Sequence, residues 1–146
     1  MTWNTIVYGT SGSTSLTLTS TLLADSINSG ANPASASFLG THGFIVNNFS
    51  YIVSNNHTLT FTAGKTYTIN NSIIISSKGS PVSWRTGTLV AANINLGSNA
   101  FMKVYNVAIT SIAATNKTIR AYSSTVTTCV NVFMLTGNIK SYSTTR

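Results

Sequence analysis

The sequence predicts an all-β fold, and three observations support this prediction. First, residues that favour strands and turns dominate, because the chain holds 24 Thr, 21 Ser and 16 Asn but no Glu or Gln. Second, short stretches alternate apolar and polar residues, as a strand with one buried face does. Third, glycines and paired Asn or Ser residues separate these stretches. We therefore expect one all-β domain over residues 1–146, an antiparallel sandwich or a jelly-roll-like barrel. A short right-handed parallel β-helix is the alternative.

The first thirty residues predict two strands and one helical turn. Residues 5–9 and 13–23 alternate in the strand manner. In residues 21–30, by contrast, Leu22, Leu23 and Ile27 could share one face of a helix that Gly30 closes. We therefore expect the only helical turn of the chain here, followed by a loop over residues 31–37.

Residues 58–69 predict a β-hairpin. Two alternating runs flank a short segment, 63–65, that contains a glycine, and such a segment is a common hairpin connection. Four large residues would face inward, namely Leu59, Phe61, Tyr67 and Ile69. The threonines between them would face outward and form a contact face for another subunit, namely Thr58, Thr60, Thr62, Thr66 and Thr68.

The remaining strands are expected on both sides of this hairpin, with no linker and no second domain. They lie in residues 43–56, 72–76, 83–96, 100–112, 117–124 and 126–143. Asn pairs begin at positions 47, 55 and 70, so they show no constant period. Because a repeat architecture requires a sustained period, we do not expect one.

Charge divides the chain into two unequal parts. Residues 1–64 contain one charged side chain, Asp25, which is the only acid of the sequence. All eight basic residues follow, namely Lys65, Lys78, Arg85, Lys103, Lys117, Arg120, Lys140 and Arg146. These cations have no acidic side chain within their own half. Solvation is the simplest role for them, and contact with an anionic partner is the alternative.

Several kinds of catalytic and cofactor site lack the residues that they require. One Asp and no Glu exclude a carboxylate pair within the chain, and no G-x-S-x-G motif frames a nucleophilic serine. His42, His57, Asp25 and Cys129 lack the spacing of metal ligands. The segment "AGKT" has Leu59 where a phosphate-binding loop needs glycine. We expect no enzymatic activity, no metal and no cofactor.

The sequence also shows no targeting or membrane segment. The stretch "MTWNTIVYG" has neither the basic nor the apolar region of a signal peptide. No run approaches the roughly 18 apolar residues of a membrane span. We expect no membrane insertion.

Two groups of residues are candidates for contact with a ligand or partner. Trp84 and Arg85 in "SWRTG" could form an aromatic platform for a sugar, unless Trp84 packs in the core and Arg85 covers it. The segments "KVYNV" and "KTIRAY" mix cations with tyrosines, as single-strand nucleic-acid binders do. Their candidate residues are Lys103, Tyr105, Lys117, Arg120 and Tyr122.

Two resemblances suggest a structural function. Residues 58–77, "TLTFTAGKTYTINNSIIISS", resemble a coil near the start of right-handed parallel β-helix proteins, which include phage tailspikes and polysaccharide lyases. The whole chain is similar in composition to small all-β capsid, decoration and fibre proteins of phages and viruses. These resemblances imply a subunit that assembles with itself, and with other virion proteins, into a virus particle or filament. Its location would be a virion or an extracellular assembly.

Two other functions remain open at this point. One is a β module that binds a carbohydrate or receptor. The other is a coat protein that contacts nucleic acid through its basic second half.

Overall fold

The computed structural model describes residues 2–8, 12–30 and 33–135, and within these ranges the regular structure consists of fifteen strands. Among these residues no helix is long and apolar enough to cross a bilayer. The strands are β1 (Thr2–Tyr8), β2 (Thr14–Leu18), β3 (Leu22–Ser29), β4 (Ala36–Gly40), β5 (Phe44–Val53), β6 (Thr58–Phe61), β7 (Thr66–Ser77), β8 (Val82–Arg85), β9 (Ala92–Leu96), β10 (Phe101–Tyr105), β11 (Val107–Thr110), β12 (Ile112–Thr115), β13 (Ile119–Tyr122), β14 (Thr125–Thr127) and β15 (Val132–Leu135).

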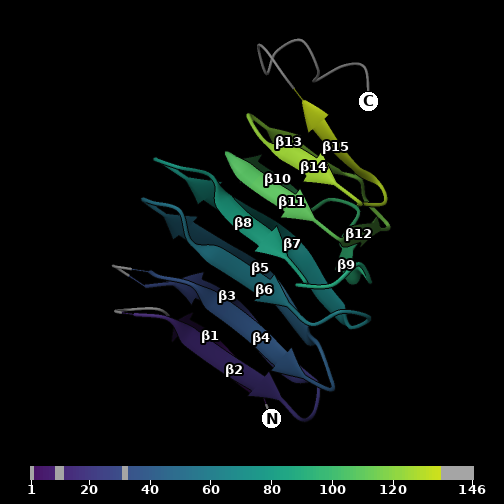
Figure 1. Ribbon diagram of the computed structural model, residues 1–146. Helices are drawn as coiled ribbons and strands as arrows, with labels where there is room; N and C mark the ends of the chain where they lie inside the picture. The colour runs from purple at the N-terminus through teal and green to yellow at the C-terminus, as the bar shows by residue number, and fades with distance from the viewer. Residues whose placement is uncertain (1, 9–11, 31–32, 136–146) are drawn as a thin grey trace.

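The described strands form two sheets in which every pair is parallel (Figure 1). One sheet has nine strands, with β1-β3-β5-β7-β10-β13-β15 in order, β9 beside β7, and β12 beside β9. The other has six, in the order β14-β11-β8-β6-β4-β2. The chain passes from one sheet to the other and back, so it winds as a coil. The expected antiparallel sandwich or jelly-roll barrel is therefore wrong, and the parallel β-helix alternative is compatible with this architecture.

We call one turn of this coil a rung. Rungs 1 to 4 consist of β1–β2, β3–β4, β5–β6 and β7–β8, rungs 5 and 6 of β9–β11 and β12–β14, and rung 7 begins with β15. In Figure 1 the rungs are stacked from the purple N-terminal strands to the yellow C-terminal ones. The solenoid axis runs along this stack, across the strands.

The rungs differ in length, and this hides the repeat in the sequence. Trp3 pairs with Ala24 in the first rungs, and the chain takes a longer path from Ser72 to its partner Phe101. Further along, the path from Val104 to its partner Ala121 is the shortest of the three. The expectation of no repeat was therefore wrong, because the structural repeat exists without a constant period. We call rungs 2 to 4 the wide rungs and rungs 5 to 7 the narrow rungs.

The predicted hairpin is instead a corner of the coil. β6 belongs to the six-stranded sheet and β7 to the nine-stranded sheet, so the two strands do not pair with each other. Gly64 adopts a φ of 75° in the segment between them, a conformation that glycine adopts easily. The predicted inward residues are confirmed, since none has exposed surface: Leu59, Phe61, Tyr67 and Ile69.

The predicted helical turn is strand β3, and the predicted loop after it contains the start of strand β4. Ala24 and Ile27 are buried, whereas Asp25 and Ser26 between them are not. Two consecutive unburied residues shift the phase of alternation, as in a β-bulge. The apolar residues therefore acquire a spacing that resembles a helix.

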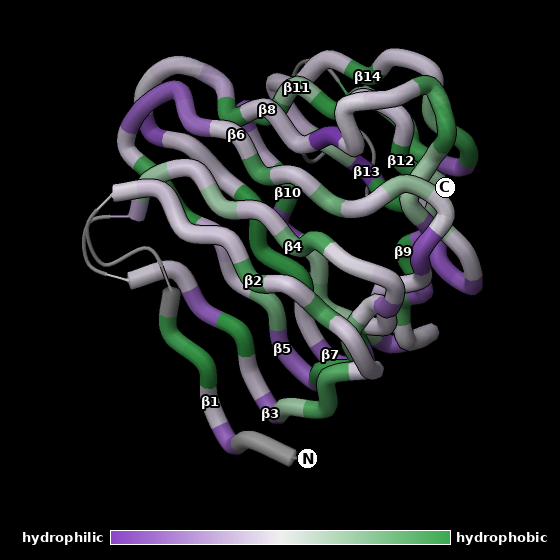
Figure 2. The backbone as a smooth tube through the Cα atoms, turned by 60° about the horizontal axis from the view of Figure 1, so that its bottom comes forward, coloured by the Kyte–Doolittle hydropathy of each residue, from purple (hydrophilic) through white to green (hydrophobic). Residues whose placement is uncertain are grey.

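The core of the wide rungs is an aromatic cluster between the two sheets. The ring of Phe44 lies 5.2 Å from that of Phe38 and 4.9 Å from that of Tyr67, both edge to face. Figure 2 shows the six-stranded sheet in front of the nine-stranded one, with hydrophobic stretches along both. Every member of the cluster is buried: Phe38, Phe44, Phe49, Phe61, Tyr67 and Trp84.

The narrow rungs have aliphatic cores and very short corners. Asn106 (φ 57°) and Ser111 (φ 56°) each stand alone between two strands, and both are left-handed. Asparagine side chains bond back to the preceding rung, because Asn106 Nδ2 donates to Gly79 O at 2.6 Å and Asn116 Nδ2 donates to Leu96 O at 2.6 Å. Asparagine tolerates this backbone conformation better than most residues. These corners allow the chain to return to the same sheet after a short path.

Candidate binding face

The last strands of the nine-stranded sheet present aromatic and cationic side chains on their outer face. In β10 the buried Val104 separates two exposed residues, Lys103 and Tyr105, and Phe101 is exposed at the start of the strand. In β13 the buried Ile119 and Ala121 alternate with Arg120 and Tyr122. The strand alternation thus sends these polar and aromatic side chains outward.

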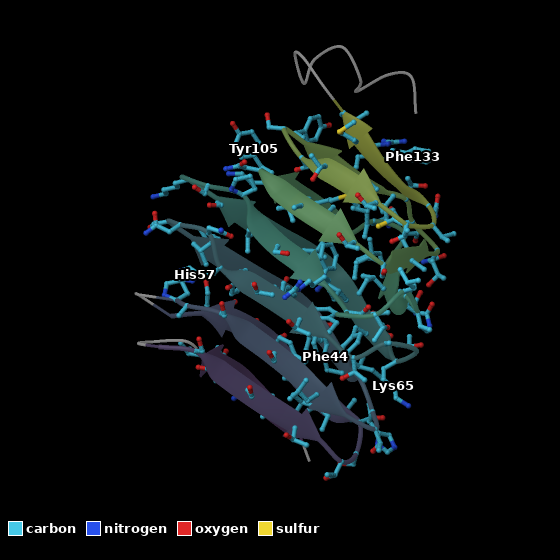
Figure 3. All side chains as sticks on the ribbon, in the orientation of Figure 1. Phe44, His57, Lys65, Tyr105 and Phe133 are labelled. Carbon is cyan, nitrogen blue, oxygen red and sulfur yellow. The ribbon has the colours of Figure 1, made fainter. Side chains whose placement is uncertain are left out.

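Register aligns the outward residues of neighbouring strands. Tyr105 pairs with Tyr122, and Arg120 pairs with Phe133 in β15. Lys103 immediately precedes Val104, and Arg120 immediately precedes its partner Ala121, so Lys103 lies beside Arg120. Figure 3 shows Tyr105 and Phe133 at the C-terminal end of the stack.

We call this surface the aromatic–cationic face. Lys103 and Arg120 form its middle row, which Phe133 continues on β15. Phe101 lies on one side of this row, and Tyr105 and Tyr122 lie on the other. Adjacent strands lie ~4.8 Å apart and alternate residues along a strand ~6.7 Å apart, so the face spans roughly 10 by 13 Å. It consists of Phe101, Lys103, Tyr105, Arg120, Tyr122 and Phe133.

A shallow groove of about 300 Å³ lies along one side of this face. Phe101, Arg120 and Tyr122 contribute to its walls, together with Lys117. Lys117 Nζ donates a hydrogen bond to Ala100 O at 2.7 Å, which holds the ammonium group over the groove. The remaining N–H bonds of this group can point toward a ligand.

The aromatic–cationic face has no acidic side chain near it. Asp25, the only acidic side chain of the sequence, lies in β3, and β5 and β7 separate that strand from β10. Three strand spacings amount to roughly 14 Å, more than the Debye length of about 8 Å at physiological salt. Asp25 also accepts hydrogen bonds from Asn47 Nδ2 at 2.9 Å and Ser26 Oγ at 3.1 Å. An external anion therefore meets cations with no competing side-chain carboxylate.

The structure places together the five candidates from "KVYNV" and "KTIRAY". All of them lie on the aromatic–cationic face or its groove, namely Lys103, Tyr105, Lys117, Arg120 and Tyr122. Sequence reasoning missed Phe101 and Phe133, which are 59% and 57% exposed. The available signal was that Lys103 and Arg120 are separated by the same interval as Tyr105 and Tyr122. Lys140 and Arg146 lie outside the described residues.

The structure separates the other candidate pair. Trp84 is fully buried in the aromatic cluster, with its ring 5.8 Å from that of Phe61. Arg85, the next residue in β8, is exposed on the six-stranded sheet. Consecutive strand residues point to opposite faces, so Trp84 offers no platform to a ligand.

The five candidate threonines do not share one face. Thr58 and Thr60 lie on the six-stranded sheet and Thr66 and Thr68 on the nine-stranded one, because a corner of the coil separates them. At that corner Thr62 Oγ1 donates to Phe38 O at 2.9 Å, a bond between rungs.

The described residues contain no group of three or more His, Cys, Asp or Glu side chains that could hold a metal ion. The expected absence of catalysis and of a cofactor stays a prediction. The fold and the face define an all-β module of two parallel sheets, compatible with a β-helix, that carries basic and aromatic side chains on one outer face. Comparison with protein-family models, with curated proteins and with solved structures finds no match to this chain.

Proposed function

We propose that this protein is a non-enzymatic module that binds an acidic glycan on its aromatic–cationic face. The observation that carries the proposal is the row of Lys103 and Arg120 between aromatic side chains on one sheet. Guanidinium and ammonium groups bind carboxylates and sulfates by charge-assisted hydrogen bonds. Aromatic rings offer flat apolar surfaces on which the C–H faces of sugar rings can pack.

The size of the face favours a glycan over a nucleic acid. Single-strand binders use a cationic groove that follows the backbone over ~4–16 nucleotides. Here the cations of the face and groove are confined to β10, β13 and the corner before β13, namely Lys103, Arg120 and Lys117. A footprint of roughly 10 by 13 Å fits about two or three sugar units. Residues 1–64 contain no basic residue that could extend a path for phosphates.

The test is binding of the purified full chain to immobilised polysaccharides. We expect saturable binding to at least one of the acidic polymers hyaluronan, alginate and heparin, and none to dextran, which is neutral. The double variant Lys103→Ala/Arg120→Ala should weaken this binding at least tenfold, and Phe101→Ala about fivefold.

A matched control removes the same charge elsewhere. Lys65 lies at the corner between β6 and β7 and Arg85 on the six-stranded sheet, so Lys65→Ala/Arg85→Ala should change the affinity less than twofold. If both double variants weakened binding equally, the binding would depend on the net charge of the protein alone. This result would overturn the proposal. Binding to a single-stranded oligothymidylate with no binding to any acidic glycan would also overturn it.

A second candidate is the structural subunit that assembles with copies of itself in a virion or extracellular assembly. The observation that favours it is the edge of rung 1. Among the described residues β1 pairs only with β3 and β2 only with β4. Neither strand contains Lys, Arg or Pro, the residues that commonly protect an edge from further pairing.

Oligomeric state tests this second candidate. Light scattering over micromolar concentrations should show a species larger than one chain. Lysine placed in the edge strand, as in Thr5→Lys, should shift it toward the monomer. A wild-type chain that stays monomeric throughout would exclude this candidate.

A further inference from the structure

A line of small polar residues continues from the aromatic–cationic face toward the N-terminus, and we call it the polar column. Register pairs Ser26 with Asn48, Asn48 with Ser72, and Ser72 with Phe101. These residues lie on β3, β5, β7 and β10, and each is at least partly exposed. The first three and the face therefore occupy one outer surface of the nine-stranded sheet.

Hydrogen bonds across the strands hold the polar column. Ser72 Oγ donates to Asn48 Oδ1 at 2.8 Å, and Asn48 Nδ2 donates to Ser26 Oγ at 3.5 Å. The amide of Asn48 has a second N–H, and the hydroxyl oxygens have further acceptor capacity. Rung spacing thus repeats donors and acceptors at a constant interval of ~4.8 Å.

A second ladder runs beside the first, where the register between β5 and β7 is irregular. Asn70 Nδ2 donates to Asn47 Oδ1 at 3.2 Å, and Asn47 Nδ2 donates to Asp25 Oδ1 at 2.9 Å. These three residues line a groove of about 270 Å³ together with the exposed apolar side chains of Leu23 and Ile45. Amides and a carboxylate next to apolar surface suit neutral sugars, whose hydroxyls both donate and accept hydrogen bonds.

We propose that the ligand is a mixed polysaccharide that lies along the solenoid axis, with an acidic unit on rungs 5 to 7 and neutral units on rungs 2 to 4. This inference rests on the proposed function and deepens it. From β3 to β15 there are five strand spacings, roughly 24 Å, enough for several sugar units. Asp25 repels a second acidic unit at the N-terminal end, so this surface selects against a uniformly charged polymer.

Three probes of defined structure test this inference by calorimetry on the full chain. The first is a disaccharide of glucuronate and glucose. The second is a hexasaccharide with one glucuronate, at either end, and otherwise glucose units. The third is a hexamer of glucuronate. We expect the hexasaccharide with a neutral tail to bind about tenfold more tightly than the disaccharide.

Two variants test whether the polar residues cause this gain in affinity. Asn48→Ala should reduce the affinity for the neutral-tailed hexasaccharide to that for the disaccharide and leave disaccharide binding unchanged. Asp25→Asn, which keeps the shape of the side chain, should raise affinity for the glucuronate hexamer about threefold and change neither of the other two. Thr60→Ala, on the outer face of the other sheet, is the matched control and should change nothing. Thermal unfolding followed by circular dichroism checks that each variant folds.

The outcomes separate this inference from the proposed function. Equal affinities for the disaccharide and the neutral-tailed hexasaccharide would overturn the inference and leave acidic-glycan binding intact. Asp25→Asn without effect on the glucuronate hexamer would overturn the selection against uniform charge. Failure of all three probes, together with failure on hyaluronan, alginate and heparin, would overturn both proposals.

Discussion

The wide rungs and the narrow rungs distribute their aromatic residues in opposite ways. In β4 to β8 the aromatic side chains are buried, as Phe44 and Trp84 are. From β9 to β15 none of the aromatic side chains is buried, as Tyr105 (42% exposed) and Phe133 illustrate. This difference indicates that the length of a rung decides whether its aromatic side chains are buried or exposed. A narrow rung leaves an interior for Val, Ile and Ala, so its aromatic residues face outward, where a ligand can reach them.

The largest expected effect on stability comes from a substitution in the aromatic core of the wide rungs. Phe44 has no exposed surface and contacts the rings of Phe38, Phe49 and Tyr67. Phe44→Ala should lower the free energy of unfolding by about 3–5 kcal/mol, whereas Ile119→Val in the narrow rungs should lower it by about 0.5–1.5 kcal/mol. Urea unfolding measures both. A loss below about 1 kcal/mol for Phe44→Ala would contradict the aromatic cluster as the main core.

The next effect concerns the single-residue corners of the narrow rungs. Asn106→Ala removes bonds from Nδ2 to Gly79 O and Ser77 O and places alanine at a left-handed φ. We expect a loss of about 2–3 kcal/mol, since the conformation costs ~1–2 kcal/mol and a hydrogen bond contributes ~1 kcal/mol. Asn106→Gly relieves the strain and should lose only about 1 kcal/mol. If urea unfolding showed that the alanine and glycine variants lose the same free energy of unfolding, the left-handed backbone conformation would be unimportant at this corner.

Alkaline pH should lower the stability of the protein through two buried tyrosines of the wide rungs. Burial raises the pKa of Tyr51 and of Tyr67, and their hydroxyls donate to Ala34 O at 2.6 Å and Phe38 O at 3.2 Å. Below the unfolded pKa of about 10 both tyrosines are neutral in either state, and their contribution is fully present. Above it the unfolded chain loses protons that the folded chain retains. Stability should then fall by up to ~1.4 kcal/mol per pH unit for each tyrosine.

Unfolding by urea between about pH 8 and pH 11.5 measures this slope. The double variant Tyr51→Phe/Tyr67→Phe is the control, and it should flatten the slope above the unfolded tyrosine pKa. An equally steep slope in this variant would place the titrating groups elsewhere, and the wide rungs would lose their special role in alkaline unfolding.

The smallest expected effect concerns the indole of Trp84. Its Nε1 is buried with no hydrogen-bond partner among the described residues. Trp84→Phe removes this unsatisfied donor, which offsets the loss of ring volume, so stability should stay within about 1 kcal/mol of the wild type. A loss above about 3 kcal/mol in urea unfolding would show that the N–H group has an acceptor.

Sequence predicted the strand content and the burial of individual residues better than the topology. Leu59 and Tyr67 face the core as alternation predicts, because a strand buries every second residue whether its neighbours are parallel or antiparallel. The segment around Gly64 looked like a hairpin turn because a hairpin turn and a corner of the coil both use glycine at a positive φ. The true partners of β6 are β4 and β8, which are distant in the sequence, and a local pattern carries no sign of them.

The binding face was predictable in its parts and not in its assembly. Lys103 and Arg120 were recognised as candidates because cations stand near tyrosines in both segments. Their position side by side follows from the narrow rung that joins β10 to β13, and unequal rung lengths elsewhere obscured this interval. Trp84 attracted a functional interpretation because tryptophan suits both a sugar platform and a core, and only the register of β8 assigns it to the core.

The change in rung length also makes the coil asymmetric along its axis. In its first rungs Trp3 pairs with Ala24, whereas in later described rungs Val104 pairs with Ala121 after a shorter path, so these two parts of the coil differ in perimeter. For the self-assembly proposed as the second candidate, we expect rungs of unequal perimeter to pair out of register when stacked head to tail. Two first rungs have equal perimeters, so we expect a contact between them to form a pair about a two-fold axis.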